Sequence, residues 1–488
     1  MSVENNTRLL TRANVGLEAK LPIKVIQFGE GNFLRAFVDY AIQQLNTKAG
    51  KSFGVSVVQP IAQGMVNMLE EQDGLYTLFM KGVKKGEEIQ EKELISNIVS
   101  TINPYTDYNA YLALAKEEGL EFIISNTTEA GIAYVPSDKP DMQPPSSFPA
   151  KLTYLLYKRF EHFNGAEDKG VTIIPCELIN YNADTLKDYI FKYIDDWSLD
   201  GEFKVWLNNT CTFHNTLVDR IVPGYPKDQI EEYNAQLDYK DNLIVTAEVF
   251  FLWVIEGDEK LKEKLPFDKT DLNVLVVEDM QPYRTRKVRI LNGAHTSMVP
   301  FGLLYGKTTV KETVDDEFTG DFIQKAVFKE IIETLDMEKE ALDKFAEEVF
   351  DRFRNPFIKH NLSSIALNSI SKFKVRVLPS LLGYVEKHEK LPVHLTFAFA
   401  CLIRFYKGDW NGSTMPINDD ATIVDFIQKA WATNEYATVT EKVLGNSLFW
   451  DKDLTKVDGL SKAITLALQE LDANGVKVAY GNFSQLYA

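Results

Sequence analysis

The order of apolar and polar positions divides the chain near residue 278. Before that point, short apolar runs bounded by turns alternate with stretches of helical periodicity. The apolar runs are 23–28, 54–59, 120–125, 171–175 and 272–277, and helices are predicted between them at 36–45, 108–116 and 151–163. Short continuous runs separated by helices are typical of parallel strands that are buried on both faces. We therefore predict an α/β domain over residues 1–278.

After Asp279 the pattern becomes helical and strand-like runs nearly vanish. Helices are predicted at 284–304, 321–334, 338–352, 358–372, 375–387, 393–407, 421–430 and 460–474. A chain of 488 residues is long enough for two or three domains of about 150 residues each. Residues 279–488 are accordingly expected to form a second, mostly α-helical domain, with the crossover at 276–283.

The composition narrows the range of partners. The chain has 70 Asp and Glu residues against 53 Lys and Arg residues, a net charge of −17. Such a surface repels nucleic acid and anionic lipid, and the longest apolar stretches fall short of the roughly 20 residues that a membrane span needs. The cysteines are odd in number and far apart, which indicates neither a disulfide framework nor a zinc site; they are Cys176, Cys211 and Cys401. We expect a cytoplasmic protein that acts on a small molecule.

The first apolar run ends in a glycine-rich turn that leads into a predicted helix. Gly29 permits the tight turn, and Gly31 allows a phosphate group to approach the backbone. The helix behind them offers free N–H groups and the positive end of its dipole. The third glycine of GxGxxG is replaced by Leu34, so an ordinary strand–turn–helix is the alternative interpretation. The candidate dinucleotide-binding residues here are Phe28, Gly29, Glu30, Gly31, Asn32 and Phe33.

The end of the second apolar run bears on the choice between NAD and NADP. NAD-binding folds commonly place an acidic residue there for the ribose 2′-hydroxyl, and NADP-binding folds place an arginine nearby. This run ends in Val58-Gln59-Pro60, which offers neither. Gln59 is therefore the candidate residue at this position, and this rule leaves both coenzymes open.

A second site is predicted on the helix around residues 284–304. At about 100° per residue, Arg284, Lys287, Asn292 and His295 fall within an arc of roughly 140°. A lysine can exchange a proton with an alcohol oxygen, and an asparagine amide can stabilise the same oxygen. A histidine can bind a neighbouring hydroxyl. One such residue alone is more often part of a solvated face, but the combination indicates catalysis. The six histidines show no HExxH or HxxxH pair, so no metal is expected.

Residues 29–35 (GEGNFLR), together with the K-x4-N-x2-H spacing of Lys287, Asn292 and His295, resemble the long-chain mannitol dehydrogenase family. Its members are metal-free, polyol-specific, NAD-dependent oxidoreductases with a Rossmann-like domain. The resemblance extends over residues 21–475. It implies that Lys287 is the general acid/base, that Asn292 polarises the substrate carbonyl and that His295 helps to hold the substrate.

Three further stretches are similar to elements of this family. Residues 125–131 (SNTTEAG) place Glu129 where the family has a glutamate near the nicotinamide. Residues 217–221 (LVDRI) imply that Asp219 lies in the substrate pocket. The RNP sequence at 354–356, followed by Lys372, is similar to the helix that carries a substrate-binding lysine.

The departures from the family pattern concern the substrate. Where mannitol-type members carry C-[DE]-N, this chain has Leu178 at the third position, so Asn180 and Asn182 are the candidates for the second oxyanion asparagine. Ser364 stands where those members have an arginine, and Arg284 stands where they have a glutamate.

These changes move positive charge rather than remove it. Arg284, Lys359, His360 and Lys372 can form a cationic pocket end that suits a carboxylate, and hence a keto-hexuronate that is reduced to a hexonate. Arg284 could instead be an ordinary surface arginine. The alternative functions are the same reaction on fructuronate, or on mannitol or its phosphate, and a dinucleotide-binding sensor without catalysis.

Overall fold

The chain divides into two units in the computed structural model, which describes residues 8–17, 20–128 and 130–487. Unit 1 comprises Met1–Lys81 and Ile89–Met280, and unit 2 comprises Gly82–Glu88 and Gln281–Ala488. The chain therefore passes finally from unit 1 to unit 2 between Met280 and Gln281.

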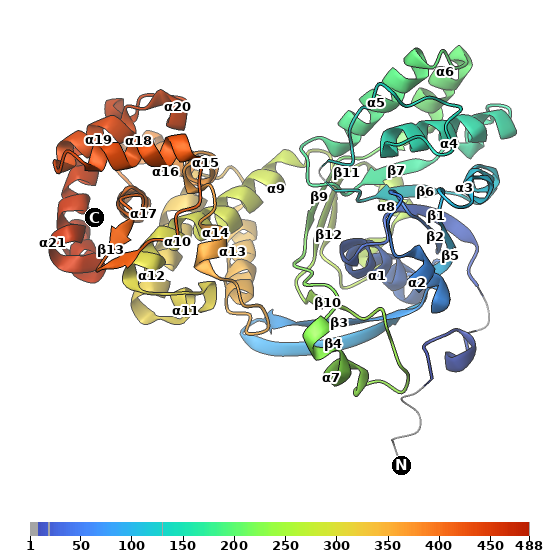
Figure 1. Cartoon of the computed structure of the whole chain (residues 1–488), viewed down its shortest axis with the longest axis horizontal. Coiled ribbons are helices and arrows are strands. Elements are labelled where there is room, and N and C mark those ends of the chain that lie inside the picture. Colours follow the sequence, from blue (N-terminus) through green and yellow to red (C-terminus); the bar gives the residue numbers. More distant parts are fainter. Residues whose placement is uncertain (1–7, 18–19, 129, 488) are drawn as a thin grey trace. The chain divides into compact units, whose positions relative to one another are not determined.

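Among the described residues, six strands form the main sheet of unit 1, in the order β5-β2-β1-β6-β7-β8 (Figure 1). All neighbouring strands are parallel, and this is the strand order of the doubly wound dinucleotide-binding fold. The predicted α/β class is confirmed, with β5 and β8 additional to the predicted runs. The strands are β1 (Ile23–Phe28), β2 (Gly54–Val58), β5 (Ile98–Ile102), β6 (Phe122–Ser125), β7 (Thr172–Pro175) and β8 (Thr212–Phe213).

The register brings the carboxyl ends of the central strands to one edge of the sheet. Phe28 lies beside Val58 on one side and beside Ser125 on the other, and Ser125 lies beside Pro175. The strand order reverses between β1 and β6. In folds of this type the ligand crevice lies outside the carboxyl ends at such a reversal.

Both faces of the main sheet are covered, which explains why its strands read as continuous apolar runs. On one face, Val25 and Ile124 pack with α1 and with Trp253 of a smaller sheet. On the other face, Ile26 and Ile123 pack with α3, α4, α5 and α6. The helices of unit 1 are α1 (Asn32–Lys48), α2 (Val66–Glu71), α3 (Tyr108–Ala113), α4 (Phe148–His162), α5 (Asn182–Asp196), α6 (Gly201–Thr210), α7 (Ile230–Asn234) and α8 (Glu259–Lys264).

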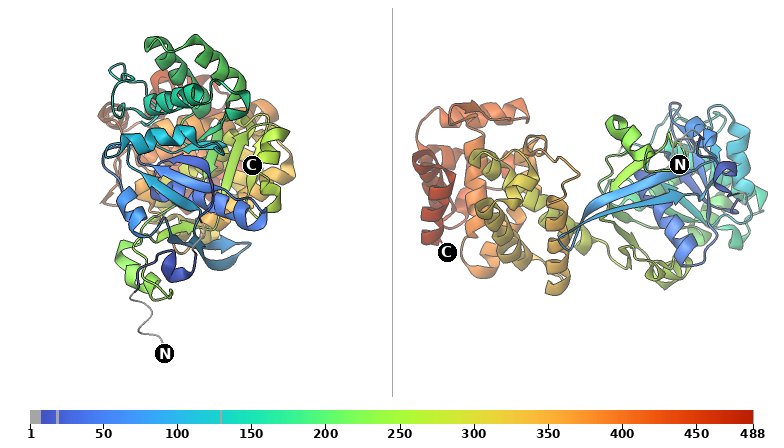
Figure 2. Two further views of the ribbon diagram at one scale, coloured as in Figure 1. Left: turned by 90° about the vertical axis from the view of Figure 1, so that its right-hand side faces the viewer. Right: turned by 90° about the horizontal axis from the view of Figure 1, so that it is seen from below.

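Two three-stranded sheets were not predicted. The first is ordered β10-β3-β4, and its strands β3 and β4 form the long blue ribbon in Figure 2. The second is ordered β12-β11-β9 and contains the apolar run at 272–277. That run is therefore half-buried in a small sheet and is not a strand of the main one. The strands are β3 (Tyr76–Lys84), β4 (Glu87–Ile95), β10 (Val245–Glu248), β9 (Thr216–Asp219), β11 (Leu252–Glu256) and β12 (Val274–Val277).

Unit 2 is rich in helices, as predicted. Helices α10 and α17 are buried on almost every side, which is typical of helices at the centre of a bundle. No described helix is long and apolar enough to cross a membrane. The helices are α9 (Gln281–Arg286), the π-helical η7 (Lys287–Asn292), α10 (Gly293–Tyr305), α11 (Val310–Asp315), α12 (Glu317–Lys325), the π-helical η8 (Ala326–Ile331), α13 (Lys339–Phe353), α14 (Leu362–Ile365), α15 (Ser369–Arg376), α16 (Leu378–His388), α17 (Val393–Phe405), α18 (Ala421–Trp431), α19 (Tyr436–Leu444), α20 (Ser447–Trp450) and α21 (Leu460–Tyr487).

Candidate active site

The glycine-rich turn joins β1 to α1 at the edge where the strand order reverses. Gly29 has a φ of +124°, and a Cβ there would lie 2.7 Å from Leu34 Cδ1 and 3.0 Å from Asn126 O. Only glycine fits this position without strain. A Cβ on Gly31 would meet no atom within 4 Å. The space in front of the N-terminus of α1 is therefore open, as a dinucleotide phosphate requires.

Buried side chains hold this turn from beneath. Gln27 Nε2 donates to Gly29 O at 3.1 Å and to Asp39 Oδ2 at 3.3 Å. Arg35 is almost fully buried, and its guanidinium donates to Glu30 O at 3.2 Å and to Asn32 Oδ1 at 2.7 Å. Burial raises the pKa of the Asp39 carboxyl to about 7. The backbone of the turn is thus fixed before any ligand binds.

The six residues predicted at this turn take different places. Gly31 borders the open space, whereas the Asn32 side chain is engaged by Arg35. Phe28 is buried in the core, where its ring lies 4.9 Å from that of Phe148. Phe33 stacks on Phe37 at 4.9 Å. The two phenylalanines therefore shape the turn through packing.

The loop that follows β6 is tied to the turn after β7 by one buried carboxylate. Glu177 Oε1 accepts hydrogen bonds from the N–H and the hydroxyl of Thr127, both at 2.9 Å. Glu177 Oε2 accepts from Ser125 Oγ at 3.1 Å, and burial raises the pKa of this carboxyl. The sequence predicted no role for Glu177, which fixes the segment leading to Glu129. Glu129 itself lies outside the described residues.

The asparagines after β7 separate into two kinds. Asn182 is fully buried; its amide donates to Pro175 O at 3.0 Å and to Glu177 O at 3.1 Å, and its Oδ1 accepts from Thr216 N at 3.0 Å. A side chain committed in this way holds the turn and has no face left for a substrate, which corrects the candidate role given to it. Asn180 is exposed at the same turn and stays the candidate. Asp219 ends β9 and is 7% exposed.

The predicted catalytic helix of unit 2 contains a π-helical turn, Lys287–Asn292. Its widened hydrogen bonding is seen where Gly293 N–H reaches Val288 O. In an α-helix, residues five apart point about 140° away from each other. In a π-helical turn, each N–H donates to the carbonyl five residues earlier, which brings residues five apart closer to one line along the helix. Turns of this kind often occur at functional sites. The turn therefore draws Lys287 and Asn292 toward one face, and both are partly exposed.

His295 follows this turn and lies among positively charged groups. Its ring is 4.5 Å from that of Phe353 and 4.9 Å from that of His360. Among the described residues, its buried Nε2 has no hydrogen-bond partner. Burial lowers the pKa of His295 well below its ordinary value, and neighbouring charges lower it further. We call the charged neighbours and His295 together the cationic cluster: His295, Arg352, His360, Lys372 and Arg376.

The cationic cluster contains three predicted residues, His295, His360 and Lys372, and two that the sequence did not suggest. His360 and Lys372 are present, and Lys372 Nζ donates to Ile365 O at 2.8 Å. Arg376 lies one turn after Lys372 on α15. The pKa of Lys372 is lowered mainly by burial and secondly by the positive charge of Arg376. Arg352 is 9% exposed on the buried face of α13. Arg352 could have been found from the sequence, because it is a positively charged residue on the apolar face of a predicted amphipathic helix. Arg284 lies on α9 and is partly exposed.

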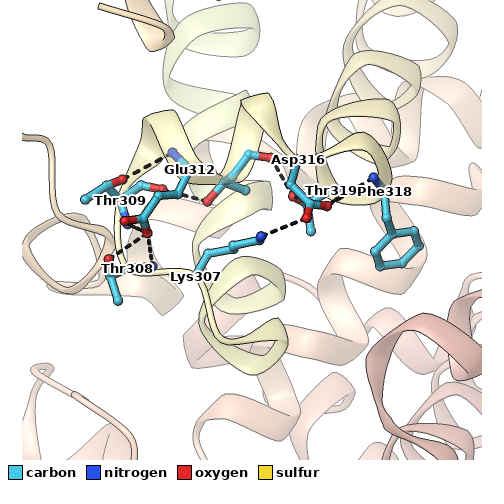
Figure 3. Close-up of polar contacts among 8 residues, drawn as sticks. Lys307, Thr308, Thr309, Glu312, Asp316, Phe318 and Thr319 are labelled. Carbon is cyan, nitrogen blue, oxygen red and sulfur yellow. Dashed lines mark hydrogen bonds and ion pairs between the residues drawn. The ribbon is translucent and has the colours of Figure 1, made fainter. Parts of the chain in front are cut away.

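The segment that carries His360 is not helical, contrary to the prediction for residues 358–372. Thr309 and Asn361 form an isolated β-bridge, and Val310 N–H donates to His360 O at 2.9 Å. Thr309 caps α11 in a capping box: its Oγ1 accepts from Glu312 N at 3.2 Å, and Glu312 Oε2 accepts from Thr309 N at 3.1 Å (Figure 3). The start of α11 thus holds His360 in the extended segment next to His295.

The lowered pKa of His295 makes the stability of the protein sensitive to acid. Because the folded pKa lies below the ordinary value of 6.5, the unfolded chain binds the proton more tightly. The contribution of His295 to stability is complete above about pH 6.5 and is lost as the pH falls toward the folded pKa. Between pH 7 and 5.5, we expect the wild type to lose about 1 kcal/mol more unfolding free energy than His295→Asn.

Urea unfolding at the two pH values would measure this difference. His162→Asn, which replaces an exposed histidine of unit 1, is the matched control and should follow the wild type. An equal loss in wild type and His295→Asn would mean that folding does not lower the pKa of His295.

Comparisons with known proteins cover both units. The mannitol dehydrogenase Rossmann domain matches residues 23–269, and the mannitol dehydrogenase C-terminal domain matches residues 279–472. The altronate oxidoreductase of Yersinia enterocolitica is 45% identical over 469 residues, which is 95% of this chain and 97% of that protein. The altronate oxidoreductase of Enterobacter sp. (strain 638) is 46% identical over 467 residues, 94% of this chain and 97% of that protein.

Two solved structures share the fold. A D-sorbitol dehydrogenase in substrate-free form has a TM-score of 0.80 at 20% identity and covers 97% of this chain and 100% of its own. The Pseudomonas fluorescens mannitol 2-dehydrogenase, in a ternary complex with NAD and D-mannitol, has a TM-score of 0.64 at 19% identity and covers 98% of this chain and 97% of its own. Within the described part of the chain, no group of three or more His, Cys, Asp or Glu side chains is arranged to hold a metal ion.

Proposed function

The chain belongs to the mannitol dehydrogenase family, and from that premise we propose that it is an NAD-dependent oxidoreductase that reduces a keto-hexuronate to a hexonate. The resemblance found in the GEGNFLR segment and the Lys–Asn–His spacing is thereby confirmed at the level of the family. The best single candidate reaction is tagaturonate and NADH to altronate and NAD. The names of the relatives at 45–46% identity support this choice.

The cationic cluster is the observation that carries the substrate class. The charges of Arg352, Arg376 and Lys372 act on His295. Its ring lies 4.9 Å from that of His360, and among the described residues its buried Nε2 has no hydrogen-bond partner. A negatively charged group of a substrate would be attracted by these three cations. A neutral polyol offers no such charge, whereas the carboxylate of a uronate can pair with an arginine through two parallel hydrogen bonds. The cluster therefore supports a sugar acid over mannitol or fructose.

The residues of unit 1 fit a nicotinamide dinucleotide. The open space at Gly31 and the N-terminus of α1 would hold the pyrophosphate, and when bound the nicotinamide supplies a hydride. We propose NADH as the coenzyme rather than NADPH.

In unit 2, Asn292 would donate to the substrate carbonyl oxygen and stabilise the charge that develops there. Lys287 would deliver the proton to that oxygen, and His295 would hold an adjacent hydroxyl.

Loss of NADH absorbance with four ketoses tests this proposal. We expect turnover with tagaturonate and fructuronate, faster with tagaturonate, little with fructose or fructose 6-phosphate, and little with NADPH. Faster turnover of fructuronate would instead make the protein a fructuronate reductase, also called a mannonate oxidoreductase. Turnover of fructose alone would favour a mannitol-type polyol dehydrogenase and contradict the role of the cationic cluster. Binding of NADH without turnover of any ketose would favour a dinucleotide-binding sensor.

A further inference from the structure

The position after β2 offers no charge of either sign to a coenzyme. Gln59 is 2% exposed, and its Nε2 donates to Ile61 O at 2.9 Å and to Ala62 O at 3.1 Å. The side chain therefore folds onto its own loop, and its donor group is used there. The usual means of selecting between NAD and NADP at this position is missing.

The carboxylate of Glu30 lies at the same place but comes from the glycine-rich turn. A Cβ on Gly64 would lie 2.2 Å from Glu30 Oε1 and 2.5 Å from Gln59 Oε1, so the two acceptor oxygens meet at Gly64. Glu30 is 7% exposed, and its Oε1 accepts from Met65 N at 3.3 Å. Since β1 and β2 are neighbours in the sheet, the residues that follow them lie side by side at its ligand-binding edge.

The Glu30 carboxylate can accept further hydrogen bonds. It offers about four lone-pair sites, and hydrogen bonds from Met65 N and from its own backbone N–H occupy two of them. The adjacent Gln59 Oε1 is a further acceptor without charge. Two acceptors side by side suit the hydroxyl groups of a ribose, which donate hydrogen bonds. A phosphate monoester brings close to two negative charges and would be repelled by the carboxylate.

We propose that Glu30 takes the place of the acid that is missing after β2, accepts a hydrogen bond from the adenosine ribose and excludes the 2′-phosphate of NADPH. This inference rests on the proposed function in one respect, that unit 1 binds a nicotinamide dinucleotide. It assigns coenzyme selection to the glycine-rich turn itself instead of to the second strand.

Binding of NADH and of NADPH without substrate tests this inference. The dissociation constants would be measured by coenzyme fluorescence for wild type, Glu30→Gln and Glu70→Gln. The Glu30→Gln amide can still accept from Met65 N, so the turn keeps its shape. Glu70→Gln is the matched control, because it removes the same charge from an exposed position of α2. We expect the wild type to prefer NADH, and we expect Glu30→Gln to reduce the ratio of the two constants by about tenfold or more.

The possible results separate this inference from the proposed function. An unchanged ratio in Glu30→Gln, or a wild type without preference for NADH, would overturn the role of Glu30 and leave the family function standing. A wild type that binds neither coenzyme would overturn both. An equal reduction of the ratio in Glu70→Gln would also overturn the inference, because the effect would then come from the general field of the domain.

Discussion

Replacing Lys287 by methionine should lower kcat for tagaturonate reduction by about 10³-fold or more, with the dissociation constant of NADH unchanged. In the proposed reaction Lys287 delivers the proton to the oxygen of the reduced carbonyl, and no other lysine lies on the π-helical turn that it shares with Asn292. The residues that we propose to bind the coenzyme belong to unit 1 and are not altered by this substitution. Steady-state kinetics with saturating NADH, together with fluorescence titration of NADH, would measure both quantities.

Lys287→Arg is the informative control for this experiment. Arginine keeps the positive charge but does not release its proton in proteins, so it should be nearly as inactive as the methionine variant. Substantial activity of Lys287→Arg would show that the residue acts through its charge and not through proton transfer. A loss of NADH binding together with turnover in both variants would indicate a structural lysine.

Replacing Arg376 by methionine should lower kcat/KM for tagaturonate by about 100-fold or more and leave the low rate with fructose almost unchanged. Arg376 lies one helical turn from Lys372, and its positive charge lowers the pKa of His295. It therefore belongs to the cationic cluster, which we propose to bind the substrate carboxylate. Truncation of one partner in a desolvated, charge-assisted pair costs several kcal/mol because the other charge is left without compensation. The effect should appear mainly in KM, since the contact is made in the ground state as well.

Lys374→Met is the matched control on the same helix. Lys374 forms an ion pair with the exposed Asp451 at 2.6 Å, and it is not among the charges that act on His295. It should keep the wild-type kcat/KM for both substrates. If Arg376→Met lost the same fraction of activity with fructose as with tagaturonate, Arg376 would serve to hold the fold of α15 and not to recognise a carboxylate.

Four strands of the main sheet could be predicted because burial on both faces makes them continuous apolar runs; they are β1, β2, β6 and β7. The first run coincides with β1, Ile23–Phe28. Strands β3 and β4 were missed for different reasons. β3 begins with five buried residues, Tyr76–Met80, that the sequence analysis did not single out, whereas β4 has no apolar run. Most residues of β4 are charged or exposed, as expected at the edge of a sheet. The run at 272–277 shows the converse, since an apolar stretch can also form a half-buried strand of a small sheet.

The site was predictable in its residue types but not in its geometry. The K-x4-N spacing is ambiguous on an ideal α-helix, because residues five apart diverge by about 140°, and the π-helical turn that draws them together leaves no mark in the sequence that we could read. Arg376 and Arg352 were missed because their approach to His295 depends on the packing of three separate helices. Asn182 was misjudged because only the structure shows that its amide is used by the backbone of neighbouring strands.

The make-up of unit 2 limits how the gene can be divided. Gly82–Glu88 belongs to unit 2, although the chain before and after it belongs to unit 1, and Lys85 N–H donates to Asp351 Oδ2 at 2.6 Å. A fragment that starts at Gln281 lacks this piece, so unit 2 cannot be expressed whole as one continuous segment that leaves out unit 1. During translation, the same piece leaves the ribosome long before Asp351 does. The second unit can therefore be completed only after most of the chain has been synthesised, which couples its folding to that of the first.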